Sequence, residues 1–319
     1  MSVNVIIDSP ARNSDLIYKT GYYCLDPFIF IEVGDKKIGF LPSTEYEKAK
    51  KKSALDEIYN LTGELQKISE TKKYPLMKSS VALDFLIKNE ISEIFVPSNF
   101  PLIEADNLRN NGVNIYTREE PFYSERISKN QKEIEYIGEN SRKNVLVMDM
   151  VKNILSESSV TNDKRLKHKG EILTVKKLQD YIYKSFVEYD LYADTVITAI
   201  GDQGCDPHET GYGDVIANAS IIVDIYPRSR KNLYYTDMTR TFCKGKASDE
   251  LKKIYDAVFT CQKMVFDKIC SRVSGKSIHL FAIDYFESKG FKSGQINGVL
   301  QGFFHGTGHG LGLECHEPP

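Results

Sequence analysis

Short apolar runs alternate with helical patterns in the first third of the chain. The runs at residues 28–33 (FIFIEV) and 37–42 (KIGFLP) flank a GDK turn and predict a β-hairpin. Residues 90–99 and 113–117 predict two more strands, and the segment between them predicts a helix that ends at a glycine. The pattern therefore indicates a small α/β domain over residues 1–125 with its own core.

A charged segment over residues 124–155 follows this domain. Apolar residues recur in it at helical spacing, among them Ile134, Ile137 and Val145, and lysine and glutamate fill many of the other positions. We expect a long solvated helix that serves as a connector without chemistry and leads into a second domain over residues 126–319.

The second domain mixes helical patterns with β-rich runs. Helices are predicted at 171–190, 248–269 and 276–290, and strands at 194–203, 220–227 and 233–245. Ser248 precedes an apolar-periodic run and is expected to cap the helix that begins there. Long helices together with antiparallel strands predict an α+β domain.

Composition narrows the class of protein. A formal net charge of -2 over 319 residues gives no reason to expect nucleic acid as a partner, because phosphate binding needs a basic surface. The chain has no apolar run of about 18 residues, which predicts no membrane span, and its start does not resemble a signal peptide. Six cysteines without a CxxC pair predict reduced thiols in a cytoplasmic protein.

Two aspartates carry the first candidate chemistry, in the stretch IIVDIYPRSRKNLYYTDMTRTF (221–242). If the turn centres between Arg230 and Lys231, Asp224 pairs with Asp237 across a hairpin, with Cβ atoms about 4.5–5.5 Å apart. Two ionised carboxylates at that distance repel unless a cation lies between them or one takes a proton. Their apolar flanks predict that both acids are partly buried.

Three interpretations of this stretch stay open on the hairpin alone. The acids could bind a metal ion, or the register could differ from the one assumed. They could also form ordinary salt bridges with one of three nearby arginines, namely Arg228, Arg230 or Arg240.

Histidines near the end of the chain favour the metal. His305 and His309 stand among glycines in HGTGHGLGL, and neutral imidazole is a common ligand of divalent transition metals. Two aspartates and a histidine form a mixed O/N set that suits Mn²⁺, Co²⁺, Zn²⁺ or Fe²⁺. His316 lies an odd number of residues beyond His309, so both reach one site only through a bend. His208 is expected in a loop that follows a strand.

Four segments in this order resemble the pita-bread metallopeptidases, and within them the Xaa-Pro aminopeptidase and prolidase group: 201–208 (GDQGCDPH), 223–242, 305–313 (HGTGHGLGL) and 316–319 (HEPP). Such enzymes also carry an N-terminal α/β domain of the creatinase type, so the resemblance covers essentially the whole chain. It implies a creatinase-like α/β domain followed by an α+β pita-bread catalytic domain whose C-terminal part is missing.

The resemblance also implies roles for matching residues. The metal ligands would be Asp224, Asp237 and His309; the catalytic residues His208 and His316; and the substrate-binding residues His208, His305 and His316. Two divalent ions are implied, Mn²⁺ or Co²⁺ foremost and Zn²⁺ as a further option. The implied reaction is hydrolysis of the bond between an N-terminal residue and a following proline. The implied partners are a peptide with proline in second position and a second copy of the chain in a homodimer.

One departure from the family pattern is serious. The family supplies two more glutamate ligands from strands that follow the HE-x-P stretch, and no segment here resembles them. We therefore expect single or weak metal occupancy and little hydrolysis. The favoured explanation is a truncated enzyme; a shortened gene with a non-catalytic product and a second chain that supplies the acids are the alternatives. A non-catalytic peptide- or protein-binding module and a metal-free relative of creatinase type also remain as functions.

Overall fold

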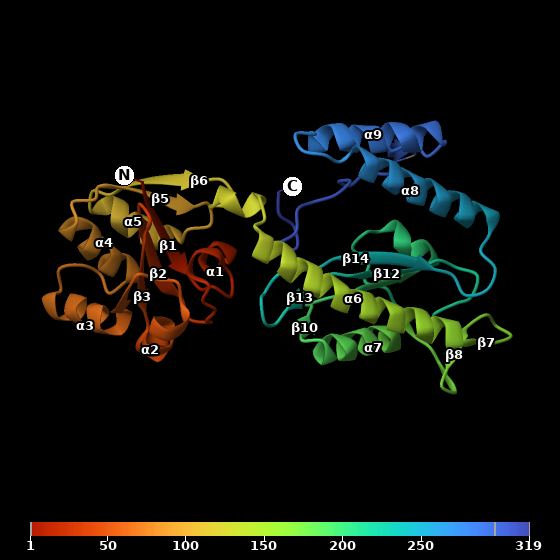
Figure 1. Cartoon of the computed structure of the whole chain (residues 1–319), viewed down its shortest axis with the longest axis horizontal. Helices are drawn as coiled ribbons and strands as arrows, with labels where there is room; N and C mark the ends of the chain where they lie inside the picture. The colour runs from red at the N-terminus through yellow and green to blue at the C-terminus, as the bar shows by residue number, and fades with distance from the viewer. Residues whose placement is uncertain (1, 297, 319) are drawn as a thin grey trace. The chain divides into compact units, whose positions relative to one another are not determined.

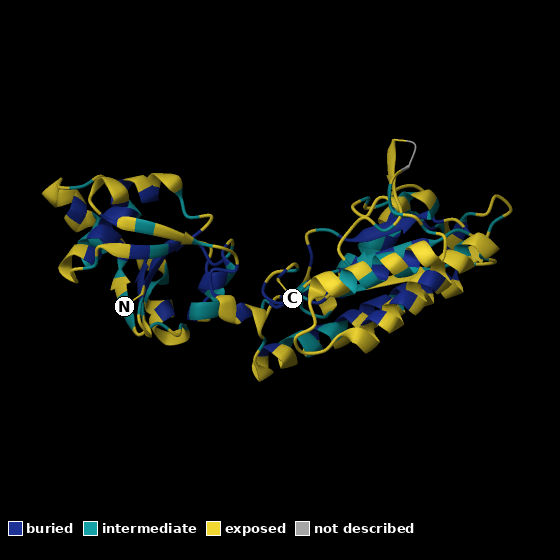
Figure 2. Ribbon diagram, turned by 90° about the horizontal axis from the view of Figure 1, so that it is seen from above, coloured by how far each residue is buried: buried dark blue, intermediate teal, exposed yellow. Residues whose placement is uncertain are grey.

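The computed structural model describes residues 2–296 and 298–318. The chain divides into two compact units, Met1–Ser128 and Lys129–Pro319 (Figure 1). Each unit has its own buried interior, and the exposed residues gather on the outer faces of its helices (Figure 2). No helix in the described ranges combines the length and apolarity that a membrane crossing requires.

The first unit contains a six-stranded sheet in the order β4-β3-β2-β1-β5-β6. Its strands are β1 (Val3–Asp8), β2 (Phe28–Val33), β3 (Lys36–Leu41), β4 (Glu57–Asn60), β5 (Glu93–Pro97) and β6 (Asn114–Arg118). Its helices are α1 (Ser14–Thr20), α2 (Ser43–Lys52), α3 (Leu61–Thr71), α4 (Lys78–Lys88) and α5 (Leu102–Asn110). The predicted hairpin is confirmed as the antiparallel pair β2–β3.

Alternation along the strands explains why this sheet is buried on both faces. Ile29 and Ile31 of β2 belong to one apolar cluster, and Phe28 and Phe30 belong to another. Successive side chains point to opposite faces of a strand, so the two clusters lie on opposite faces of the sheet. Strand β1 was not predicted, although it joins β2 to β5 within the sheet.

The second unit begins with the long helix α6 (Gln131–Glu157), which starts at a capping box formed by Asn130 and Glu133. Three short strands follow, β7 (Ser159–Val160), β8 (Leu166–His168) and β9 (Glu171–Ile172), then helix α7 (Val175–Glu188). The remaining elements are β10 (Leu191–Tyr192), β11 (Ile197–Ile200), β12 (Ile221–Ile225), β13 (Arg228–Ser229), β14 (Met238–Phe242), α8 (Asp249–Lys268), α9 (Gly275–Ser288), β15 (Gly294–Ile296) and β16 (Val299–Gln301).

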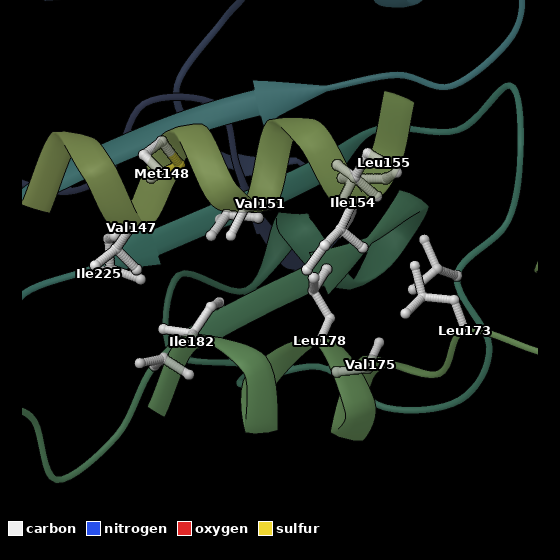
Figure 3. Close-up of a cluster of buried hydrophobic side chains, with 14 of the residues drawn as sticks. Val147, Met148, Val151, Ile154, Leu155, Leu173, Val175, Leu178, Ile182 and Ile225 are labelled. Atoms are coloured by element: carbon white, nitrogen blue, oxygen red, sulfur yellow. The ribbon is translucent and has the colours of Figure 1, made fainter. Parts of the chain in front are cut away.

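The core of the second unit lies between helices α6 and α7 and one face of a three-stranded antiparallel sheet. The sheet order is β11-β12-β14, so β12 is the central strand. Figure 3 shows Val151 of α6 and Leu178 and Ile182 of α7 pointing into this cluster, with Ile225 of β12 beside Val147. The apolar stripes of the two helices therefore fix which face of β12 is buried.

Two predicted boundaries in this unit were wrong for local reasons. The strand expected over 194–203 ends at Ile200, because Gly201 has a positive φ of 59° and a 3₁₀ turn begins there. The strand expected from residue 233 begins at Met238, after Leu233 with a φ of 67°. The helix expected at 248–269 is confirmed, with the Ser248 side chain accepting from the backbone N–H of Leu251 at 3.1 Å.

Candidate metal centre

Asp224 faces away from the core because of its place in β12. Ile221, Val223 and Ile225 alternate with it and are fully buried in the cluster under α6 and α7. The aspartate side chain therefore lies on the opposite face of the sheet, where it is half-buried. Its Oδ1 accepts a hydrogen bond from Thr239 Oγ1 on β14 at 2.6 Å.

The hairpin register differs from the prediction by two residues, so the centre of the turn moves by one. Asp224 stands opposite Thr239, and the turn centres between Lys231 and Asn232. The predicted direct pairing of Asp224 with Asp237 is therefore wrong. The shift has a local cause, because the Ser229 hydroxyl accepts from the backbone N–H groups of Lys231 at 3.1 Å and Asn232 at 3.3 Å.

The shift keeps the two acids on one face. Asp237 is two residues before Thr239, so it lies on the face that Thr239 shares with Asp224. The backbone N–H of Thr236 bonds the Pro227 carbonyl at 2.9 Å, which carries the same register up to Asp237. Diagonal neighbours of this kind lie about 7–8 Å apart, a spacing at which two carboxylates can share a cation.

His309 approaches Asp237 from the tail of the chain. Its Nε2 lies 3.4 Å from Asp237 Oδ2, with the two side chains 34% and 27% exposed. Its Nδ1 lies 2.9 Å from the carbonyl oxygen of Gly310. An Nδ1–H donated to a backbone carbonyl leaves the Nε2 lone pair free to face the aspartate side, which is the arrangement that a metal-binding histidine uses.

The tail forms the bend that the spacing of His309 and His316 requires. Gly310 and Glu317 pair in an antiparallel bridge, with backbone hydrogen bonds of 2.7 and 3.0 Å. The two imidazole rings meet edge to face with centroids 4.4 Å apart. The structure therefore brings His316 beside His309, although the odd separation would place them on opposite faces of an extended strand.

Burial dominates the electrostatics of both acids. It raises the pKa of the Asp224 carboxyl above its ordinary value, against the hydrogen bond from Thr239, and the nearby charge of Asp237 raises that pKa further. Burial likewise raises the pKa of Asp237, and the imidazoles of His309 and His316 act in the opposite direction. Removing carboxylates from water disfavours their charged form unless a cation compensates.

The salt-bridge interpretation of the two acids is contradicted. Arg240 donates to the backbone carbonyl of Thr239 at 2.8 Å. Arg228 and Arg230 lie over the ring of Tyr192, 5.7 and 5.8 Å from its centroid. In the part of the chain that the structure describes, neither Asp224 nor Asp237 pairs with a lysine or an arginine.

Two predicted substrate residues make their contacts away from Asp237 and His309. His208 is exposed in the loop after the 3₁₀ turn Gly201–Cys205, where its backbone N–H bonds the Asp206 carboxylate at 3.0 Å. His305 is exposed too, and its ring packs edge to face on Phe303 with centroids 4.7 Å apart. The structure records no contact of either side chain with Asp224, Asp237 or His309 among the described residues.

The chemistry of these side chains fits a divalent cation, while their present geometry is incomplete. Two carboxylates without permanent counter-ions and a histidine with Nε2 toward one of them are an O/O/N donor set of the kind that Mn²⁺, Co²⁺ or Zn²⁺ accepts. Within residues 2–296 and 298–318, however, no group of three or more His, Cys, Asp or Glu side chains is already gathered to hold an ion.

Sequence reasoning missed two residues beside these donors. Thr239 stands in TDMTRTF, and only the correct register shows that its hydroxyl faces Asp224. Glu317 is buried, with its side chain 2% exposed, and its carboxylate pairs with Lys129. A glutamate between a histidine and two prolines gives no signal of burial in the sequence.

Comparison with known proteins assigns the chain to a protein family. The pattern of metallopeptidase family M24 matches residues 142–319. The uncharacterized peptidase YqhT of Bacillus subtilis is 30% identical over 150 residues, which are 47% of this chain and 39% of that protein. The chain thus spans about two fifths of the length of that relative. The Xaa-Pro dipeptidase of Pyrococcus furiosus is 25% identical over 97% of this chain and 78% of that protein.

Solved structures agree on the fold. The X-Pro aminopeptidase from Thermotoga maritima covers 100% of this chain and 82% of its own with a TM-score of 0.77 at 18% identity. The prolidase from Pyrococcus furiosus covers the same shares with a TM-score of 0.73 at 19% identity. The architecture is therefore an α/β creatinase-like unit followed by a pita-bread unit, and the chain belongs to metallopeptidase family M24.

Proposed function

We propose that this chain is a metal-dependent peptidase that acts on the bond between an N-terminal residue and a following proline. The observation that carries the proposal is the approach of His309 Nε2 to Asp237 Oδ2, on the sheet face that Asp224 shares. The Xaa-Pro dipeptidase that aligns with 97% of the chain supports the substrate class.

Asp224, Asp237 and His309 would hold the cation, with Mn²⁺ or Co²⁺ preferred and Zn²⁺ accepted. A bound divalent cation supplies positive charge that polarises a scissile carbonyl and makes a water molecule more acidic. The chain's own side chains would donate a proton and contact the peptide. The edge-to-face contact with His309 holds the imidazole of His316 at the site, where it can donate a proton to a developing oxyanion. His208 and His305 would contact the peptide substrate.

Occupancy by one ion is the expected state of residues 1–319. Two ions would bring four positive charges to a site where the described residues offer two carboxylates and one imidazole. Uncompensated charge in a partly buried site is costly, so the second ion binds poorly. We therefore expect weak hydrolysis from this chain.

The test measures metal and activity together. Isothermal titration with Mn²⁺ should give about one ion per chain in the wild type, and Asp237→Ala should abolish binding. Asp256→Ala serves as the control, because Asp256 is an exposed acid on α8. Hydrolysis of an Xaa-Pro dipeptide and an Xaa-Pro tripeptide is followed in the same samples. Unchanged binding in Asp237→Ala would refute the ligand assignment.

A non-catalytic peptide-binding module is the second candidate. The absence of a gathered three-ligand group among the described residues favours it. If the wild type binds no Mn²⁺ and cleaves neither peptide, yet binds an Xaa-Pro peptide in the same titration, this second function replaces the first.

A further inference from the structure

Helix α6 carries a buried polar stripe beside its apolar one. Glu133, Asn140 and Asn144 are 4%, 0% and 0% exposed. Their spacing of seven and four residues puts them on one side of the helix. Burying polar groups costs free energy unless they are hydrogen-bonded, so each of these side chains needs a specific partner.

The partners lie next to the two candidate aspartate ligands. Asn144 Nδ2 donates to the carbonyl oxygen of Ile225 at 3.0 Å, and Ile225 directly follows Asp224. Three residues before Asn144 on the helix, Ser141 Oγ lies 3.1 Å from Thr236 Oγ1, and Thr236 directly precedes Asp237. The stripe therefore holds the backbone beside each acid.

Tyr234 adds two more bonds between the same helix and the loop that leads to Asp237. Its hydroxyl donates to Glu133 Oε1 at 2.9 Å, and its carbonyl accepts from Asn140 Nδ2 at 2.9 Å. All the side chains involved are buried. Hydrogen bonds in such surroundings are strong and directional, so they restrict where the loop can lie.

The third ligand segment is held at the start of the same helix. Lys129 Nζ, just before α6, lies 2.6 Å from Glu317 Oε2. Glu317 Oε1 accepts from the backbone N–H of Glu314 at 3.1 Å. Glu317 also pairs through its backbone with Gly310, the residue after His309. The ion pair therefore fixes the tail hairpin that bears the imidazole.

Glycines permit this close approach. A Cβ at Gly312 would stand 2.5 Å from Glu317 Oε2, and a Cβ at Gly310 would stand 2.2 Å from the carbonyl oxygen of Pro318. Any larger residue would push the hairpin away from the buried carboxylate. The backbone N–H of Tyr235 then bonds the Gly312 carbonyl at 2.8 Å, which links the tail to the loop before Asp237.

We propose that the polar stripe of Glu133, Asn140 and Asn144, extended by Ser141 and by Lys129 just before the helix, positions Asp224, Asp237 and His309 toward one another. These are positioning residues, since they act through the backbone that carries the ligands. The inference rests on the proposed function in that it takes these three residues as the ligands. Outer partners of metal ligands usually change metal affinity by about 10- to 100-fold when they are mutated.

The first experiment compares two stripe variants with a core variant of the same helix. Asn144→Leu and Lys129→Met should each weaken Mn²⁺ binding by about 10- to 100-fold in isothermal titration. Val151→Ala is the control, because Val151 is fully buried in the apolar cluster. It should lower the melting temperature and change the affinity less than about twofold. A control that loses affinity in proportion to its stability, or stripe variants that keep theirs, would overturn the inference.

The second experiment needs no metal. The ring signals of His309 and His316 in metal-free protein, observed by ¹⁵N NMR, should move in Glu317→Gln, whereas the His208 signals should not. Adding Lys129→Met to Glu317→Gln should restore part of the wild-type spectrum, because removing both partners of a buried pair disturbs less than leaving one charge. Wild-type protein that binds no Mn²⁺ would defeat the proposed function alone. Unmoved ring signals would defeat the positioning role alone.

Discussion

Asp15 in the first unit is buried and Asp224 in the second is half-buried, and these two acids differ in their partners. In the first unit, Asp15 pairs with Arg126 at 3.1 Å, with the two side chains 4% and 2% exposed. In the second unit, Asp224 accepts from a threonine hydroxyl and has no lysine or arginine partner within the described ranges. Burial raises the pKa of both carboxyls. An acid with a permanent counter-ion stabilises the fold, whereas an acid without one can bind an exchangeable cation.

The sharpest way to break this comparison is to remove the acid that has a permanent partner. Asp15→Ala removes the carboxylate that pairs with the buried Arg126 guanidinium, and the first unit should lose about 3–5 kcal/mol of stability. Amide hydrogen exchange in β1 and β2 reports that unit's own unfolding. Asp106→Ala is the control, because the Asp106–Arg109 pair is exposed. A loss no larger than the control's would show that the buried pair is dispensable.

Two cysteines, one in each unit, also differ in how far burial changes their chemistry. Burial, with the charge of Glu45 second, raises the pKa of the Cys24 thiol to about 11, whereas Cys205 is exposed. The thiolate is the reactive form, so iodoacetamide should label Cys24 about a hundredfold more slowly than Cys205 in the folded protein. Mass spectrometry of labelled peptides measures both rates. A Cys24 labelling rate that does not increase when the protein is unfolded in urea would contradict the burial of Cys24.

Asp224→Asn should have the opposite sign to Asp15→Ala. The amide can still accept from the Thr239 hydroxyl, and it removes a half-buried charge that lacks a counter-ion. Metal-free protein in EDTA should gain about 1 kcal/mol of stability. Hydrogen exchange in β11 and β12 measures the gain, and added Mn²⁺ should stabilise only the wild type. A destabilised variant would mean that Asp224 serves the fold as Asp15 does.

The smallest effect is expected at the surface of the first unit. Hydrogen bonds from Lys36 and Tyr59 lower the pKa of the Glu57 carboxyl. A lowered folded-state pKa stabilises the fold above the unfolded value of about 4.3 and loses that contribution as pH falls through the folded value. Because the side chain is 36% exposed, Glu57→Gln should cost at most about 1 kcal/mol at pH 7. Denaturation at pH 7 and pH 4 should show the difference shrinking, and a growing difference would contradict the sign.

Much of the candidate site could be predicted because local patterns encode it. The alternation in IIVDI indicates that Asp224 points away from a buried face, and the structure has it there. The glycines around His309 permit a close backbone approach, which Gly310 and Gly312 make against Pro318 and Glu317. The long helix α6 was also predicted from its spacing. These features depend on neighbours in sequence.

What could not be predicted depends on partners distant in sequence. The hairpin register rests on Ser229 and on Asn232, whose side chain meets that of Asn140, 92 residues away, at 2.9 Å. Helix α6 was expected to be a solvated connector, yet it buries Asn140 and Asn144. A polar residue in a helical pattern has the same appearance in sequence whether water or a backbone carbonyl satisfies it. Strand β1 was missed because its short apolar run is held in the sheet by pairing with β2 and β5, and the sequence does not show which strands will pair.

The turn between β12 and β14 restricts how this chain can tolerate insertions. Side chains alternate along each strand. One residue added near Lys231 that shifts the register would therefore put Asp237 on the opposite side of the sheet from Asp224. Two added residues would lengthen the loop and leave both aspartates on the same side. Length variation at this turn should therefore come in pairs, and odd steps should separate the acids even where the sheet itself survives.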